Sequence, residues 1–318
     1  MLPPFAATPP GALDLTGDAA RRRRQLQRGA AAALERAGYQ ELIPPSFEYE
    51  DVFLRAGGAG VATRLVRFPD RDGRILALRY DFTSSLARVA STTFAGAELP
   101  LRLSYAGKVF RQDPERGGRA REMLQVGAEL LGAVGLEADV EIVRLTLALV
   151  RETGLSDYQL NLGHAGVLAP GLATLNEPLR AEARRWIDRK DRAALTHALG
   201  GEAGDARCLV TLPFVIGRRE AVEAALRGAP RGAAPGLTHL LELDQALTPD
   251  ERRHVVYDLG EVRGLDYYTG VHFEVYVAGA GRAAGAGGRY DELMGRFGRP
   301  MPAVGFSLDL DTLAEVPV

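Results

Sequence analysis

The stretch "VRGLDYYTGVHFEVY", residues 262–276, joins two different patterns. Its second half alternates as a strand does, with Val271, Phe273 and Val275 on one side and His272 and Glu274 on the other. Its first half places an arginine, an aspartate and two tyrosines around a glycine. The strand supplies apolar packing, and the polar cluster that precedes it needs a separate explanation.

The rest of the chain interleaves hairpins with helices. Two alternating runs flank "DRDG" within residues 64–83 and predict a β-hairpin. Residues 101–112 and 121–132 predict two further strands, and residues 135–155 predict an amphipathic helix. Residues from about 166 to 250 are rich in Ala, Leu and Arg and predict mostly helix. Because no regular strand–helix–strand rhythm occurs, the sequence favours an α+β fold with a mixed, mainly antiparallel sheet flanked by helices.

Composition narrows the class of protein. The chain has 318 residues, of which 46% are hydrophobic, enough for a sizeable core. Its net charge of −2 provides no overall basic field for nucleic acid. The single cysteine, Cys208, excludes an internal disulfide and fits a reducing compartment. No apolar run reaches the roughly 18 residues needed to span a bilayer, and the first residues do not resemble a secretory signal. We therefore expect a cytoplasmic protein that does not enter the membrane.

One predicted strand has a face that is polar in an unusual way. Met123, Gln125, Gly127 and Glu129 share one side of it, while the residues between them form a continuous apolar layer. A solvent-exposed face explains the polar residues. The glycine between them weakens a strand and often marks a close approach of another group, so a ligand-facing surface fits equally well.

Three other places carry candidate chemistry with a plain structural alternative. Asp81 and Thr83 stand at a strand-to-helix junction, where they either cap the helix or receive the ammonium group of a ligand. Arg111 opens an arginine-rich hairpin loop that either grips a phosphate or carboxylate or is a hydrated turn. The run 21–24 of four arginines is either a solvated helix face or a patch for tRNA or phosphate.

Several familiar chemistries are not indicated. The glycine-rich segment 277–293 lacks the G-x-G-x-x-G spacing of a dinucleotide site. The five histidines have no partners at metal-ligand spacing, and neither a nucleophile elbow nor a P-loop occurs. We therefore expect no metal and no cofactor.

Six segments in order along the chain resemble the histidyl-tRNA synthetase family of class II synthetases. They are residues 39–58, 78–88, 105–132, 262–276, 286–293 and 303–313. The pairing of "RGLDYYTG" with "GGRYD" is the most specific part of the resemblance. It implies a class II synthetase-like catalytic core as a single unit over residues 1–318, with a helical insertion at about 166–250. It also implies a homodimer with residues 42–58 at its interface.

The resemblance further implies a histidine-binding pocket. Its residues here are Asp81, Thr83, Arg111, Gln125, Glu129, Arg263, Tyr267 and Tyr268. In the family pattern, Glu129 and Tyr268 hold the two nitrogens of the imidazole ring. A neutral imidazole has one donor and one acceptor nitrogen, so a carboxylate and a tyrosine hydroxyl can read both ends. Tyr267 belongs to the same wall as Tyr268.

The remaining roles concern the two charged groups of the amino acid. By resemblance, Asp81, Thr83 and Gln125 hold the ammonium, and Arg263 faces the carboxylate. Arg111 points to the region of an ATP α-phosphate. The family usually has Pro-Glu-Gly where this chain has "YDF" at 80–82, so the carboxylate of Asp81 is one methylene shorter than the family's glutamate.

Two departures separate the chain from an active synthetase. The third class II motif ends in G-L-x-R, but Asp309 stands in place of its glycine and Thr312 in place of its arginine. This removes a cation from the triphosphate site and adds a carboxylate, which disfavours phosphate binding. The sequence ends at Val318, so we expect no anticodon-binding domain.

A kept histidine pocket with a damaged ATP site is similar to the paralogous family of ATP phosphoribosyltransferase regulatory subunits. The resemblance implies a non-catalytic chain that joins a short-form catalytic subunit, in an expected hetero-octamer, for the first step of histidine biosynthesis. Histidine is then the feedback inhibitor. Two alternatives remain: a truncated synthetase-like enzyme that forms histidyl-adenylate, and a nucleic-acid-binding paralogue that uses residues 21–24. The net charge weighs against tRNA as a partner.

Overall fold

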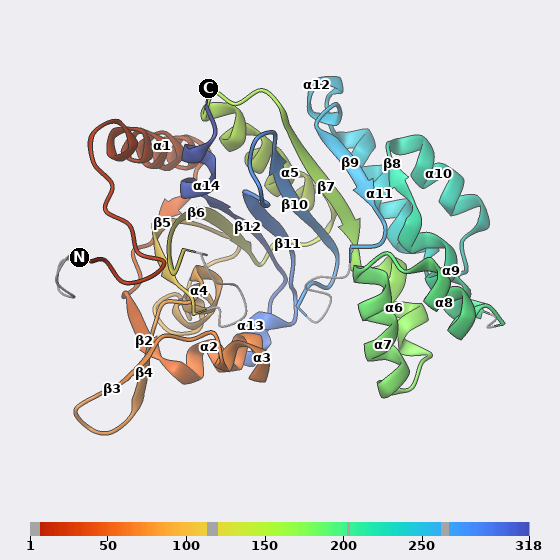
Figure 1. The fold of residues 1–318 in the computed structure, drawn as a ribbon, viewed down its shortest axis with the longest axis horizontal. Helices are drawn as coiled ribbons and strands as arrows, with labels where there is room; N and C mark the ends of the chain where they lie inside the picture. The colour runs from red at the N-terminus through yellow and green to blue at the C-terminus, as the bar shows by residue number, and fades with distance from the viewer. Residues whose placement is uncertain (1–6, 113–119, 202–203, 262–266, 318) are drawn as a thin grey trace.

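A nine-stranded sheet forms the centre of the molecule (Figure 1). The structure, a computed structural model, describes residues 7–112, 120–201, 204–261 and 267–317. In spatial order the strands are β1 (Gln40–Glu41), β5 (Leu101–Phe110), β6 (Glu122–Leu131), β12 (Ala303–Asp309), β11 (Gly285–Arg289), β10 (Val271–Val277), β7 (Tyr158–His164), β9 (Val255–Asp258) and β8 (Ile216–Gly217). The pairs β1–β5 and β7–β9 run parallel and the other six are antiparallel. The predicted mixed, mainly antiparallel sheet is therefore confirmed.

A smaller antiparallel sheet contains the predicted hairpin. Its order is β2 (Phe47–Tyr49), β4 (Ile75–Leu78) and β3 (Arg67–Pro69). Arg79, directly after β4, is buried and donates hydrogen bonds to the carbonyl oxygens of Pro44, Pro45 and Lys108 at 2.8–3.1 Å. This guanidinium ties the proline-containing segment to strand β5, because it donates to backbone acceptors on both.

Helices cover the large sheet on the side of its apolar face. α1 (Gly17–Arg36) buries Leu26, Ala30 and Leu34, which recur every four residues and so share one stripe. α5 (Gly135–Glu152) follows the prediction closely, and α14 (Leu310–Glu315) packs between α1 and β6. The remaining helices near the small sheet are α2 (Glu50–Gly57), α3 (Ala59–Ala62), α4 (Phe82–Ser91) and α13 (Leu293–Arg296).

The segment between β7 and β9 is mostly helical. It contains α6 (Ala165–Ala173), α7 (Glu177–Asp188), α8 (Arg192–Leu199), α9 (Cys208–Thr211), α10 (Arg219–Gly228), α11 (Ala234–Ala246) and α12 (Pro249–Arg252). These helices gather at one end of the large sheet, beside β7 and β9, in green to light blue (Figure 1). Every helix within the described ranges is too short or too polar to cross a membrane.

Part of the glycine-rich segment, Gly285–Arg289, forms strand β11. β11 lies between β10 and β12 in the centre of the sheet, so it does not form a phosphate-binding loop that opens a helix. A Cβ at Gly287 would lie 2.5 Å from the Phe273 ring and 2.7 Å from Cβ of Phe306. The absence of a side chain at this position allows bulky neighbours to close over the strand.

Candidate functional site

A pocket of about 320 Å³ opens on the polar face of β6. Its walls come from β5, β6, β11, β12, the start of α4 and the residues just before β10. The lining residues are Thr83, Tyr105, Arg111, Met123, Gln125, Glu129, Tyr267, Tyr268, Ala283, Gly285, Ala286, Gly287, Tyr290, Gly305, Phe306, Ser307 and Asp309. Six of the eight residues predicted for a histidine site are among them.

Glu129 is the most enclosed charged group of the pocket, with 1% of its surface exposed. Thr83 Oγ1 donates a hydrogen bond to Glu129 Oε1 at 2.8 Å. The Tyr105 hydroxyl shares its hydrogen between the same oxygen at 3.4 Å and the carbonyl oxygen of Phe306 at 3.3 Å. The Tyr290 hydroxyl donates to Oε2. A carboxylate offers about four acceptor positions, so these three hydroxyls leave room for about one further donor. The arrangement fixes the carboxylate and leaves it able to accept an N–H from a ligand.

Burial also alters the charge of this carboxyl group. Loss of water contact raises the pKa of Glu129 to about 7, although the hydrogen bonds from Tyr290 and Thr83 act in the opposite direction. The buried phenols beside it, Tyr105 and Tyr290, have pKa values raised well above the ordinary value by burial and by the neighbouring carboxylate. They therefore stay neutral and serve as hydrogen-bond donors at physiological pH.

Two glycines let the walls approach Glu129 closely. A Cβ at Gly305 would lie 1.6 Å from Glu129 Oε2, and a Cβ at Gly127 would lie 2.2 Å from the carbonyl oxygen of Phe306 and 2.4 Å from the hydroxyl of Tyr105. The glycine in the polar face of β6 thus marks a close approach, as the sequence suggested. The alternate residues Leu124, Val126, Ala128 and Leu130 all lie in the main hydrophobic core.

Tyr267 and Tyr268 form an aromatic wall. Their ring centroids are 5.2 Å apart in an edge-on arrangement, and the Tyr267 ring stacks on Tyr290 at 5.2 Å. The Tyr268 ring stacks on His272 of β10 at 5.7 Å. This wall holds flat rings in fixed orientations, which suits a planar aromatic ligand.

The other end of the pocket is more polar and more open. Gln125 on β6 lies opposite Asp309 on β12, and Glu129 lies opposite Gly305. The two pairs are four residues apart, so they are separated by roughly 13 Å along the strand. Asp309 lines this end and caps α14 by accepting hydrogen bonds from the backbone N–H groups of Asp311 and Thr312 at 3.0 and 3.1 Å.

Thr312 stands at the position where the synthetase pattern has a triphosphate-binding arginine. The side chain of Thr312 is fully buried in α14 and contributes no charge to the pocket. Arg111 does line this end, where its Nε donates to the carbonyl oxygen of Tyr80 at 3.1 Å and its guanidinium lies 4.9 Å from the Tyr80 ring centroid. Among the described lining residues, this end of the pocket therefore presents the guanidinium of Arg111 together with the carboxylate of Asp309.

Asp81 and Arg263 are the two predicted residues that are absent from the described lining of the pocket. Asp81 caps α4 by accepting a hydrogen bond from the backbone N–H of Ser84 at 2.7 Å, which is one of the two roles that the sequence allowed, and it is not among the described lining residues. Arg263 lies outside the described residues.

Sequence reasoning did not include Tyr105 and Tyr290 in the site. Tyr105 lies opposite Gly127 in the β5–β6 pair, and Tyr290 follows β11. The motif "GGRYD" contained Tyr290, and Tyr105 lies on a strand that the sequence predicted. Neither pattern specifies that both hydroxyls meet the same carboxylate.

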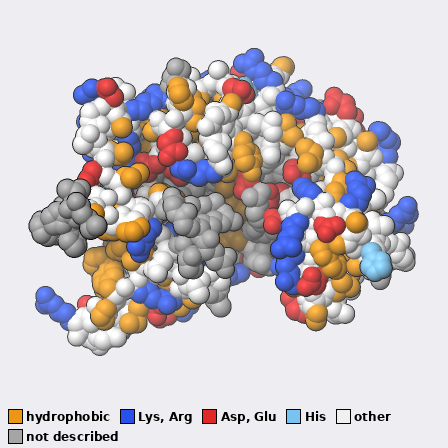
Figure 2. Space-filling view, in the orientation of Figure 1, with side chains coloured by type: hydrophobic (Ala, Val, Ile, Leu, Met, Phe, Trp, Pro, Cys, Tyr) orange, Lys and Arg blue, Asp and Glu red, His pale blue; other side chains and the backbone are white. Residues whose placement is uncertain are grey.

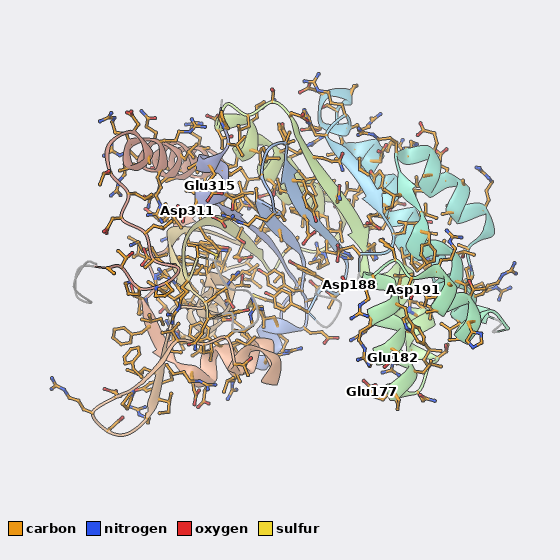
Figure 3. The ribbon with its side chains drawn as sticks, viewed as in Figure 1. Glu177, Glu182, Asp188, Asp191, Asp311 and Glu315 are labelled. Carbon is orange, nitrogen blue, oxygen red and sulfur yellow. The ribbon has the colours of Figure 1, made fainter. Side chains whose placement is uncertain are left out.

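The arginine run of α1 is committed to contacts within the protein. Arg21 pairs with Asp18, Arg22 donates to the carbonyl oxygen of Thr153 at 3.1 Å, and Arg23 pairs with Asp311 at 2.6 Å. Asp311 is labelled on α14 in Figure 3. On the face drawn in Figure 2, Lys and Arg side chains alternate with Asp and Glu. These contacts weigh against a phosphate-binding patch on α1.

No group of three or more His, Cys, Asp or Glu side chains within the described ranges could hold a metal ion.

Comparison with known proteins gives a consistent family. The sequence matches the family model described as histidyl-tRNA synthetase over residues 11–313. It is 40% identical over 314 residues to an ATP phosphoribosyltransferase regulatory subunit of Moorella thermoacetica, covering 96% of this chain and 80% of that protein. It is 34% identical over 317 residues to one from Syntrophotalea carbinolica, covering 96% and 74%.

Solved structures agree in fold. An ATP phosphoribosyltransferase regulatory subunit/histidyl-tRNA synthetase from Bacillus halodurans has a TM-score of 0.88 and 29% identity, covering 99% of this chain and 84% of that one. A chain of the Thermotoga maritima ATP phosphoribosyl transferase (HisG:HisZ) complex has a TM-score of 0.71 over 91% of this chain and 97% of its own. At 19% identity, the likeness to the second concerns the fold alone.

Proposed function

The chain belongs to the histidyl-tRNA synthetase family and, within it, to the regulatory subunits of ATP phosphoribosyltransferase, and on that premise we propose that it binds histidine and passes this signal to a catalytic subunit. Regulatory subunits are non-catalytic components of the enzyme complex. The observation that carries the proposal is the buried Glu129 carboxylate, held by three hydroxyls and open to one more donor.

The inner end of the pocket suits an imidazole ring. An imidazole N–H donates to Glu129, and the ring lies against the aromatic wall of Tyr267 and Tyr268. The hydroxyl of Tyr268 serves the second nitrogen. A different amino acid in this place leaves buried polar groups without partners, which is the main source of discrimination in such a site. Gln125 and Thr83 are the described groups placed to meet the ammonium.

The outer end disfavours the enzymatic alternative. Arg111 is the feature that supports adenylate formation, because it can face a phosphate. Asp309 stands at the same end and repels a triphosphate, while Thr312 supplies no counter-charge. Binding of histidine without its activation fits this balance of charges.

The partners that we propose are a short-form catalytic subunit, in a hetero-octamer, and a second copy of this chain. The Thermotoga maritima structure is described as a complex of HisG with HisZ, and its fold resembles this chain. Large apolar side chains are exposed in and near the segment proposed for self-association: Ile43 is 82% exposed and Phe47 50% exposed. Figure 2 shows hydrophobic side chains gathered over β2 and β4.

The proposed location is the cytoplasm. Cys208, the chain's single cysteine, is free and buried, and burial raises the pKa of its thiol to about 12. Such a thiol is inert and needs neither an oxidising compartment nor a disulfide partner.

Calorimetric titration tests the ligand. We expect histidine to bind with one site per chain, and ATP to add no measurable heat to the histidine-bound protein, because Asp309 opposes the triphosphate. Tyr268→Phe should weaken histidine binding by about 1–3 kcal/mol, since a buried nitrogen loses its partner. A folded wild-type protein that shows no heat with histidine at millimolar concentration contradicts the proposal, whereas ATP binding that depends on histidine favours the enzymatic alternative.

A further inference from the structure

Arg289, the residue before Tyr290, is held in a buried ion pair with α5. Its Nη2 lies 2.7 Å and its Nε 2.9 Å from Oδ1 of Asp139, and the two side chains are 10% and 2% exposed. Nη1 also reaches Asp291 Oδ1 at 3.2 Å. Neither Arg289 nor Asp139 lines the pocket. Two-point contact with a carboxylate fixes the direction of a guanidinium more firmly than a single charge contact does.

The backbone of Arg289 connects this ion pair to Tyr290 and to the segment that carries Tyr268. Its carbonyl oxygen accepts hydrogen bonds from the N–H of Thr269 at 2.7 Å and from Thr269 Oγ1 at 3.4 Å. Thr269 is the neighbour of Tyr268, and Tyr290 is the neighbour of Arg289 itself. A shift of Arg289 therefore moves the hydroxyl that fixes Glu129 and the segment that carries Tyr268 together.

The second oxygen of Asp139 faces the helical segment. Oδ2 lies 2.8 Å from Nε2 of His239 on α11, and the His239 ring is 5.3 Å from the ring of His164 at the end of β7. His164 Nδ1 accepts the N–H of Gly166 at 3.0 Å and so caps α6. A Cβ at Gly236 of α11 would lie 2.9 Å from His164 Nδ1, so α11 packs tightly against this junction.

Burial fixes the charge state of one ring beside this ion pair, His164. It lowers the pKa of His164 to about 4, so that ring stays neutral and keeps its acceptor nitrogen for Gly166. The carboxylate of Asp139 contacts both Arg289 on the sheet and His239 on α11, and so joins the two elements. Since buried ionic groups lose much when one partner is removed, the three side chains act as a unit.

We infer that Asp139 and Arg289 are positioning residues of the pocket, acting from outside it, and that His239 extends their support to helix α11. Asp139 holds Arg289, and Arg289 sets the places of Tyr290 and Tyr268 through its backbone. The inference rests on the proposed function for the identity of the ligand, which is histidine. It also gives the helical segment a direct physical connection to the pocket, through Asp139 and α11.

The test is Asp139→Asn, with Asp244→Asn as the matched control. Asp244 is also a buried carboxylate, and it lies on α11. It pairs with Arg219 at 3.2 Å and accepts a hydrogen bond from the hydroxyl of Tyr257 at 3.0 Å. It does not touch the pocket. Both variants should lower the melting temperature. Asp139→Asn should weaken histidine binding about 2- to 30-fold in calorimetry, and the control should leave it unchanged.

A second readout does not depend on histidine. In the unliganded protein, hydrogen exchange at the N–H of Thr269 should be faster in Asp139→Asn than in Asp244→Asn, because its acceptor on Arg289 is no longer held. If the wild type binds no histidine, the proposed function fails and the exchange result alone decides the positioning role. Equal exchange in both variants, or equal histidine affinity in both, overturns the inference. Should Asp139→Asn not fold, His239→Phe replaces the imidazole by another aromatic ring, removes the Nε2 contact and should shift both readouts in the same direction.

Discussion

Glu129→Gln is expected to weaken histidine binding by about 10- to 150-fold while the protein stays folded. The ligand's imidazole N–H then donates to a neutral amide instead of a carboxylate, and hydrogen bonds to charged groups are worth about 1.5–3 kcal/mol. The substitution keeps the volume of the side chain, so Gly305 and Tyr105 need not move. Calorimetry with histidine measures the change.

Glu122→Gln is the matched control for this prediction. Glu122 lies on the same strand, pairs with Lys108 and does not line the pocket. Its substitution should leave histidine affinity within twofold, because surface ion pairs contribute little. Unchanged affinity in Glu129→Gln means that the ligand does not use this carboxylate, and the assignment of the imidazole site is then wrong.

The stability of the unliganded protein should depend on pH through Glu129. Its pKa is about 7 in the folded protein against an ordinary value of 4.5, so the folded state keeps a proton that the unfolded state has released. The stabilisation from this group is complete below pH 4.5 and is lost as the pH rises to 7, a change of about 3 kcal/mol. Urea unfolding of the wild type and of Glu129→Gln at several pH values measures it as a difference between the two proteins.

The difference between the two proteins isolates Glu129 from other titrating groups. His164 acts in the opposite direction, because its pKa is lowered from 6.5 to about 4 and its contribution is lost as the pH falls through that range. Both proteins contain His164, so its effect cancels. The stability advantage of the wild type over Glu129→Gln should shrink between pH 4.5 and 7.5, and parallel curves would contradict the raised pKa.

Local patterns in the sequence predicted much of the fold. Alternation predicted β5, β6 and β10, and the "DRDG" turn predicted the β3–β4 hairpin. The strand order could not be predicted, because β12 enters between β6 and β11 and pairs residues that are far apart in the chain. β11 was missed as a strand since glycine disfavours strands, and its place depends on contacts with Phe273 and Phe306 that no local pattern shows.

The residues of the site also divide into those that the sequence predicted and those that only the pairing of distant strands brings together. The polar face of β6 located Gln125 and Glu129, and local patterns singled out Thr83 and Arg111 with a structural alternative for each. The resemblance to synthetases joined these four residues to the two tyrosines of the opening stretch. The hydroxyls of Tyr105 and Tyr290 converge on Glu129 only through the pairing of separate strands. The use of Asp81 as a helix cap was one of two roles open in the sequence, and backbone geometry at the start of α4 distinguishes them.

The most direct test of the whole proposal is ATP phosphoribosyltransferase activity of a short-form catalytic subunit mixed with this chain, measured with and without histidine. Regulation requires that histidine bind the inhibited assembly better than the active one. We predict that the wild-type chain supports activity that histidine suppresses, and that Glu129→Gln supports similar activity with a histidine response shifted at least tenfold to higher concentration. Equal inhibition of both assemblies by histidine, or no effect of this chain on the catalytic subunit, would contradict the proposal.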